Sequence, residues 1–143
     1  MVFKKKKLIR FHHCDPAGIV FYPQYLVLCN ETVEDWLAEG LGTGLDVLIH
    51  ELKRGLPMRH LEAEFLLPSV QGEVLEFQLS VLRIGGTSLN LVIEAWGDNG
   101  LRFFSQQTII WSDLEGPKPV RIEPEWREKF AHYMKPNESE ADT

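Results

Sequence analysis

The chain has 143 residues, of which 44% are hydrophobic and 25% are charged, and its formal net charge is −6. This length and composition fit one globular domain, and the acidic balance argues against a general nucleic-acid binder. No run of 18 or more apolar residues is present, so we expect no membrane partner through a spanning helix. Two cysteines without a convincing export signal favour reduced thiols and a cytoplasmic location.

The N-terminal part predicts a strand over 6–11, a loop of turn formers over 12–22 and a long helix over about 23–39. Pro23 suits a first helical turn, where its missing N–H is not needed. Apolar residues then recur at spacings of three and four, which gives the helix one apolar face. Closely spaced glycines end it, and a short second helix is expected over 46–54.

Beyond residue 57 the hydrophobic period changes to two, which indicates strands with one apolar face. Asp98-Asn99-Gly100 is a strong hairpin signal. A short helix over 123–135 is expected to close a single domain of residues 1–135, and the acidic tail 136–143 is predicted to be disordered. The predicted strands cover 60–65, 75–81, 89–95 and 101–111.

These elements define an α+β fold: an antiparallel sheet of about five strands wrapped around one long central helix. The helix is the only predicted element large enough to cover the apolar face of the sheet. Trp96, Phe103 and Trp111 are large aromatic residues on these strands. They could anchor a contact between subunits or pack in the subunit's own core.

One carboxylate, Asp15, stands just before the start of the long helix. A carboxylate can attack a polarised carbonyl directly or activate water as a general base. Free N–H groups at a helix start can bind the oxyanion that develops. An isolated Asp-Pro before a helix is otherwise a turn or cap residue.

The stretch Cys14-Asp15-Pro16-Ala17-Gly18-Ile19-Val20, followed by Phe21-Tyr22-Pro23-Gln24-Tyr25, resembles a known active-site signature. It is similar to that of the 4-hydroxybenzoyl-CoA thioesterase family of hotdog-fold proteins, and the order of elements agrees over about residues 5–130. The resemblance implies that Asp15 is the catalytic carboxylate and that the backbone N–H of Tyr22 polarises the carbonyl. Gly18 would let the loop pass close to the substrate, and Tyr25 could stack on a ring or belong to the core.

Two positions near the signature depart from the family. His13 stands where close aromatic thioesterases carry an acidic residue, and it could tune Asp15 or donate to the substrate. Asn30 stands where the 4-hydroxybenzoyl-CoA enzyme places a carboxylate on the ring hydroxyl of its substrate. Because Asn both donates and accepts hydrogen bonds, the activity could carry over with a different preferred acyl group.

Coenzyme A binding is the third departure. Of the arginines that hold its phosphates in the aromatic enzyme, only Arg83 has a counterpart here, and Arg59 is another candidate. His12 and His13 are adjacent, so their side chains point apart, and no second cluster completes a metal site. We therefore expect no metal and no cofactor other than the coenzyme A of the substrate.

The leading hypothesis is an acyl-CoA thioesterase that acts on an aromatic or medium-sized acyl group and forms a homodimer or homotetramer, as the resemblance implies. The alternatives are a hotdog hydratase or dehydratase acting on a thioester-bound chain, and a non-catalytic module that binds acyl-CoA or acyl-carrier protein. The residues leave open the acyl group, the carrier, and whether Asp15 attacks directly or activates water.

Overall fold

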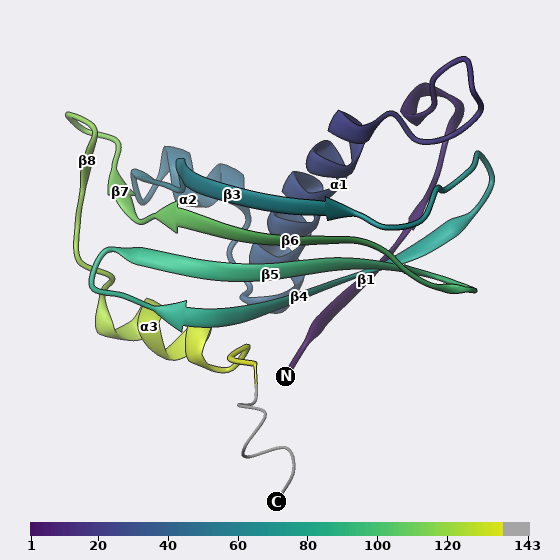
Figure 1. Ribbon diagram of the computed structural model, residues 1–143. Helices are drawn as coiled ribbons and strands as arrows, with labels where there is room; N and C mark the ends of the chain where they lie inside the picture. Colours follow the sequence, from purple (N-terminus) through teal and green to yellow (C-terminus); the bar gives the residue numbers. More distant parts are fainter. Residues whose placement is uncertain (136–143) are drawn as a thin grey trace, which may run out of the picture.

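A five-stranded antiparallel sheet forms the centre of the molecule, and the computed structural model describes residues 1–135. The strands follow the order β1-β4-β5-β6-β3, and the sheet curves around one long helix (Figure 1). The α+β class and the hotdog arrangement are therefore confirmed. The strands are β1 (Phe3–Leu8), β3 (Met58–Phe65), β4 (Val74–Ile84), β5 (Ser88–Gly97) and β6 (Gly100–Ile110).

The long helix α1 (Tyr22–Asp35) continues as a π-helical turn over Trp36–Gly40, close to the predicted extent. Its apolar face is buried against the sheet. Burying one such large apolar side chain contributes roughly 1.5–3 kcal/mol, so packing rather than local propensity holds the helix in place. The buried residues of α1 are Tyr25, Leu28, Cys29 and Thr32.

The first strand differs from its prediction, since β1 begins at Phe3 and ends at Leu8. The run of lysines lies within this edge strand, where charged side chains prevent pairing with other chains. Lys5 and Lys7 turn toward the helix layer and pair with Glu39 and Asp35. A 3-10 turn, Phe11–His13, then replaces the predicted end of the strand.

Smaller elements close the far end of the sheet. The helix α2 (Leu45–His50) is shorter than predicted, and a second, three-stranded sheet that was not predicted is formed by β2 (Arg54–Gly55), β7 (Ser112–Asp113) and β8 (Lys118–Pro119).

The helix α3 (Pro124–Ala131) stops short of the predicted residue 135. The chain after it turns at His132 and Tyr133 and then forms one bridge to β4: Val81 N–H donates to the carbonyl of Tyr133 at 2.8 Å, and Lys135 N–H donates to the carbonyl of Val81 at 2.8 Å. This parallel bridge at Met134 lies beside β4 just beyond Phe3, where β1 begins, so the predicted last turn of the helix is replaced by a bridge to the sheet. The predicted tail, 136–143, lies outside the described residues.

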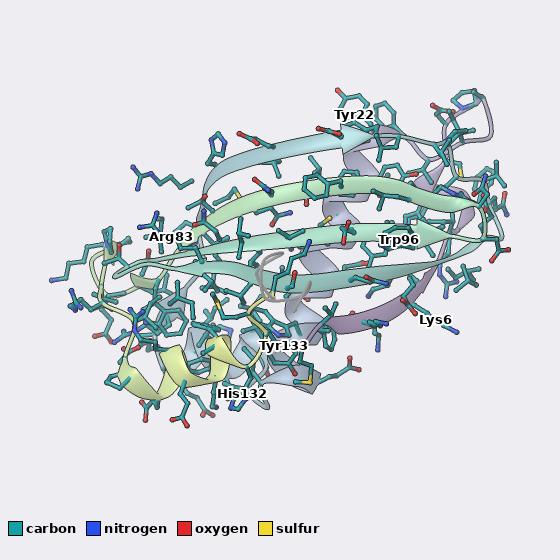
Figure 2. The ribbon with its side chains drawn as sticks, turned by 60° about the horizontal axis from the view of Figure 1, so that its bottom comes forward. Lys6, Tyr22, Arg83, Trp96, His132 and Tyr133 are labelled. Carbon is teal, nitrogen blue, oxygen red and sulfur yellow. The ribbon has the colours of Figure 1, made fainter. Side chains whose placement is uncertain are left out.

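The two faces of the main sheet differ in character. The face toward α1 is apolar and includes Phe77 and Phe103, while the opposite face carries Lys6 and Trp96 (Figure 2). Phe103 and Trp111 are fully buried, so they belong to the subunit's own core, whereas Trp96 remains 38% exposed on the open face.

Candidate functional site

The loop that carries Asp15 is a tight, hydrogen-bonded turn. Asp15 N–H donates to the carbonyl of Ile19 at 3.0 Å, and Gly18 N–H donates to the carbonyl of Asp15 at 2.9 Å. Gly18 has a φ of +82°, in the left-handed region that favours glycine. Gly18 thus allows the turn that folds Ile19 back beside Asp15.

The Asp15 carboxylate is half-buried and lines a pocket. One of its oxygens, Oδ1, accepts a hydrogen bond from Ala17 N–H at 2.9 Å. Within residues 1–135 the other oxygen meets no hydrogen-bond donor. One oxygen is therefore anchored by the turn, while the other is left free for chemistry.

The start of α1 leaves one backbone donor unpaired. Phe21 is the extended N-cap residue and its N–H donates to the carbonyl of His13 at 2.9 Å, while Gln24 N–H turns back to Phe21 at 2.8 Å. Pro23 has no N–H. The Tyr22 N–H meets no acceptor in the described part of the chain, and it points from the positive end of the helix dipole.

A pocket of about 400 Å³ lies between this helix start and the end of β3. Its lining is mostly apolar and aromatic, and Asp15 is the one charged residue among the lining residues. Tyr25 stacks on Phe103 at 5.0 Å between ring centroids, while Phe65 meets Tyr22 edge-on at 5.8 Å. The lining residues are Asp15, Ile19, Val20, Phe21, Tyr22, Tyr25, Phe65, Leu66, Leu67 and Pro68.

The wall formed by 65–68 was missed in the sequence. Phe65 reads as the last apolar residue of a strand, and the apolar run after it reads as the approach to the turn at Pro68. An available signal was that three large apolar residues in a row outlast the period of two, so they cannot all be buried in the core. Phe65 is 48% exposed, which leaves its ring free to contact a ligand.

His13 lies beside a different cavity from Asp15. It is only 4% exposed, and its Nδ1 accepts a hydrogen bond from Arg10 N–H at 2.8 Å. Burial first, and then the neighbouring His12, lower the pKa of His13. The cavity it lines is about 410 Å³ and also contains Glu31 and the N-terminal lysines. A direct contact between His13 and a ligand of the Asp15 pocket finds no support within one subunit.

The remaining predicted site residues lie away from the pocket of their own subunit. Asn30 is exposed on α1. Arg83 faces Asn90 across β4 and β5, and the same row of the sheet ends at His60 on β3. Phe65 is five residues farther along β3, about 17 Å at the usual rise of a strand. Arg83 and Arg59 therefore lie near the opposite end of the sheet from the pocket, and Figure 2 shows Arg83 toward the α3 end.

Two other kinds of site find no support in the described residues. Across 1–135, no three His, Cys, Asp or Glu side chains converge to hold a metal ion. No helix in the same range is long and apolar enough to cross a membrane.

Comparison with known proteins agrees with this geometry. A family model described as the thioesterase-like superfamily matches residues 9–130. A 1,4-dihydroxy-2-naphthoyl-CoA hydrolase of Synechococcus elongatus is 30% identical over 86 residues, which are 58% of this chain and 61% of that enzyme. The chain thus matches only about three fifths of that relative's length.

Solved structures share the fold over nearly the whole chain. A 1,4-dihydroxy-2-naphthoyl-CoA thioesterase from Synechocystis superposes with a TM-score of 0.83 at 21% identity, covering 95% of this chain and all of that one. A thioesterase-superfamily protein from Jannaschia sp. CCS1 reaches a TM-score of 0.89 at 20% identity, covering 94% of each chain. Because the family model spans most of its residues, the chain belongs to the thioesterase-like superfamily.

Proposed function

We propose that this protein hydrolyses acyl-CoA thioesters to a free acid and coenzyme A. The observation that carries the proposal is the placement of a half-buried carboxylate and an unpaired helix-start N–H around one apolar pocket. Asp15 would act as nucleophile or general base. The Tyr22 N–H would stabilise the oxyanion, and coenzyme A would leave as its thiolate.

Two routes are compatible with this arrangement. In one, an Asp15 oxygen bonds to the carbonyl carbon, the carbon–sulfur bond breaks, and water hydrolyses the resulting anhydride. In the other, Asp15 takes a proton from a water molecule that attacks the same carbon. Both release one acid and one coenzyme A, and neither needs a metal or another cofactor.

We infer that the acyl group is aromatic. The pocket presents the rings of Phe21, Tyr22, Tyr25 and Phe65, and offset or edge-to-face contacts with a planar acyl group would each contribute about 0.5–1.5 kcal/mol. The hydrolase from Synechococcus elongatus and the structure from Synechocystis are both named for a naphthoyl ester. A fused-ring acyl group is therefore a better starting substrate than 4-hydroxybenzoyl-CoA.

A second copy of the chain would complete the site. The free edge of β3 exposes Leu61 and Phe65, whereas the other edge, β1, is protected by lysines. Pairing along β3 would give the homodimer, and association of two dimers would give the homotetramer. In such a dimer Asn30, Arg59 and Arg83 from the second copy could meet the acyl ring or the phosphates of coenzyme A, which they do not reach within one subunit.

The acyl preference tests the part assigned to Asn30. We expect Asn30→Asp to change the ranking among ring-substituted acyl-CoAs by several-fold, because a carboxylate accepts from a ring hydroxyl but cannot donate. An identical ranking in kcat/KM would place residue 30 outside the pocket.

The direct test is thiol release from a panel of naphthoyl-, benzoyl- and straight-chain acyl-CoAs, with wild type and Asp15→Asn assayed side by side. We expect turnover that is highest on the aromatic esters and is lost in the variant. Binding without turnover would favour a non-catalytic module or a carrier-protein substrate. Addition of water to an unsaturated acyl-CoA would instead indicate a hydratase.

A further inference from the structure

A buried polar network lies behind the wall of the pocket, and its centre is Arg102 of β6. The guanidinium is only 4% exposed. It donates to Glu73 at 2.7 Å from Nη2, to the hydroxyl of Ser69 at 3.0 Å and to the carbonyl of Pro68 at 3.1 Å. Its Nε donates to Asn99 at 2.9 Å. Such a charged, multiply bonded group holds several backbone segments in one geometry.

A β-bulge places Arg102 where it can do this. Ala95 of β5 pairs with Phe103 and Trp96 pairs with Leu101, so Arg102 is the extra residue between two registered pairs. A bulge re-aims the side chain of the extra residue. The Arg102 carbonyl also accepts from Leu66 N–H at 2.9 Å and from Leu67 N–H at 3.3 Å. The backbone and side chain of one residue thus both hold the pocket wall.

The hairpin between β5 and β6 packs directly against the guanidinium. A Cβ atom added at Gly97 would lie 2.5 Å from Cζ of Arg102, so only a glycine lets the backbone come this close. Glu73 is bound from the other side, where one of its oxygens also accepts from Val70 N–H at 2.8 Å. The hydrogen bonds from Arg102 lower the pKa of Glu73.

Ser69, which is fully buried, connects this network to both parts of the candidate active site. Its carbonyl accepts from Val20 N–H at 2.9 Å, in the loop that carries Asp15. Its hydroxyl accepts from the Tyr25 hydroxyl at 2.8 Å, one turn into the helix whose first N–H belongs to Tyr22. The loop and the helix start are therefore tied to the same residue.

We propose that Arg102 and Ser69 are positioning residues that fix the Asp15 carboxylate relative to the Tyr22 N–H. This inference rests on the proposed thioesterase function and assigns it two residues that touch neither the substrate nor the reacting atoms. The two catalytic groups come from different segments, and a small misplacement of one against the other costs rate, because the transition state needs both at once. Arg102 holds Ser69, and Ser69 holds both segments.

The prediction is a loss in kcat rather than in binding. Ser69→Ala removes the hydroxyl that joins the helix but leaves the carbonyl that holds the loop, and Tyr25→Phe removes the other half of the same bond. We expect each to lower kcat at least about tenfold with KM within about threefold of wild type. Both changes break the same Tyr25–Ser69 hydrogen bond, and Ser69→Ala also removes the acceptor for Arg102, so the double variant should be no slower than Ser69→Ala alone.

The matched control for Arg102→Lys is Arg54→Lys. Arg54 likewise donates to a glutamate, Glu123 at 2.8 Å, but it is only partly buried and lies near α3, away from the pocket. Both replacements should lower the melting temperature, and only Arg102→Lys should also lower kcat. If Arg102→Lys fails to fold, the Ser69→Ala and Tyr25→Phe pair still decides the question.

A second readout separates this inference from the proposed function. Amide resonances of Asp15 and Tyr22 are compared between wild type, Ser69→Ala and Arg54→Lys by NMR, without substrate. We expect both resonances to shift in Ser69→Ala and to stay in place in Arg54→Lys. Unmoved resonances, or a wild-type kcat in Ser69→Ala, would overturn the positioning role. If the resonances shift in Ser69→Ala but the wild-type protein hydrolyses no thioester, the proposed function is overturned and the positioning role is not.

Discussion

Two cavities of similar size flank the turn between β1 and α1, and they differ completely in chemistry. The Asp15 pocket is walled by aromatic and aliphatic side chains around one carboxylate. The cavity beside His13 is lined by charged residues, and several are already neutralised: Lys7 pairs with Asp35, and Lys5 pairs with Glu39 at 2.8 Å. A free charge in an apolar pocket can act on a substrate, whereas charges paired with each other mainly hold elements together.

This contrast shows why neighbours in sequence need not share a site. His13 and Asp15 are two residues apart, yet the 3-10 turn directs the His13 ring to the β1 side, while the glycine turn directs Asp15 toward β3.

The largest expected effect comes from replacing Asp15 by asparagine, and the comparison is the same replacement at His13. Asp15→Asn should lower kcat at least about 100-fold, because an amide is neither a base nor an effective nucleophile, while its oxygen can still accept from Ala17 N–H. His13→Asn should change kcat by less than about threefold. Thiol-release assays on both variants, with circular dichroism as a check on folding, decide this. Comparable losses in the two variants would mean that both cavities serve the reaction.

A smaller effect on KM is expected at Phe65, in the pocket wall formed by 65–68. Phe65→Ala should raise KM for an aromatic acyl-CoA about threefold to tenfold, because one ring contact contributes about 0.5–1.5 kcal/mol. It should leave KM for a short aliphatic acyl-CoA nearly unchanged. Leu82→Ala, a similarly exposed apolar residue on β4 that lines neither cavity, is the control. An equal change for aromatic and aliphatic substrates would remove Phe65 from ring recognition.

The pH dependence of stability should report on the His13 cavity. The pKa of His13 is lowered in the folded state from its ordinary value of 6.5. The folded protein therefore binds this proton less tightly than the unfolded chain. The contribution of His13 to the free energy of unfolding is fully present above pH 6.5 and is lost as the pH falls below that value.

Urea unfolding between pH 8 and pH 5 measures this slope. Glu73 and Glu123, whose pKa values are also lowered, contribute only as the pH falls below their usual value of 4.5. His13→Asn should flatten the curve in the upper range, since the amide oxygen replaces Nδ1 as the acceptor for Arg10 N–H. An unchanged slope in this variant would assign the titration to another group.

The smallest effect is expected at the ion pair that joins β1 to α1. Lys7→Met should lower the free energy of unfolding by about 0.5–1 kcal/mol, because the pair is partly exposed to solvent. The difference from wild type should shrink at high salt, and turnover should be unchanged. A loss of turnover would show that this side of the helix communicates with the Asp15 pocket.

Much of the architecture could be predicted because periodicity reports burial directly. The alternation of apolar and polar residues from 75 to 81 and from 89 to 95 corresponds to the buried face and the less buried face of β4 and β5, although Ser80 and Val92 on the second face are buried as well. The start of β1 was placed three residues too late, because a run of four lysines carries no hydrophobic period. The second sheet was missed because its strands are two residues long, too short for any period.

Only the part of the candidate site that lies in one continuous segment was predicted from the sequence. Asp15 and Tyr22 belong to a single continuous signature, so their proximity to one pocket could be anticipated. Arg102 could not, because it stands in a strand between two apolar residues, and only the bulge in the register turns it behind the wall. The separation of His13 from Asp15 depended on a 3-10 turn that no hydrophobic period signals.

The close approach of Gly97 to Arg102 sets a limit on how this chain can vary. Position 97 is near a surface hairpin, where substitutions are usually accepted, yet any side chain there would collide with a buried guanidinium. Selection for activity from a library randomised at position 97 should therefore return glycine almost alone. Libraries at two exposed positions, Asp98 in the same hairpin and Leu82 far from it on β4, should return many residues.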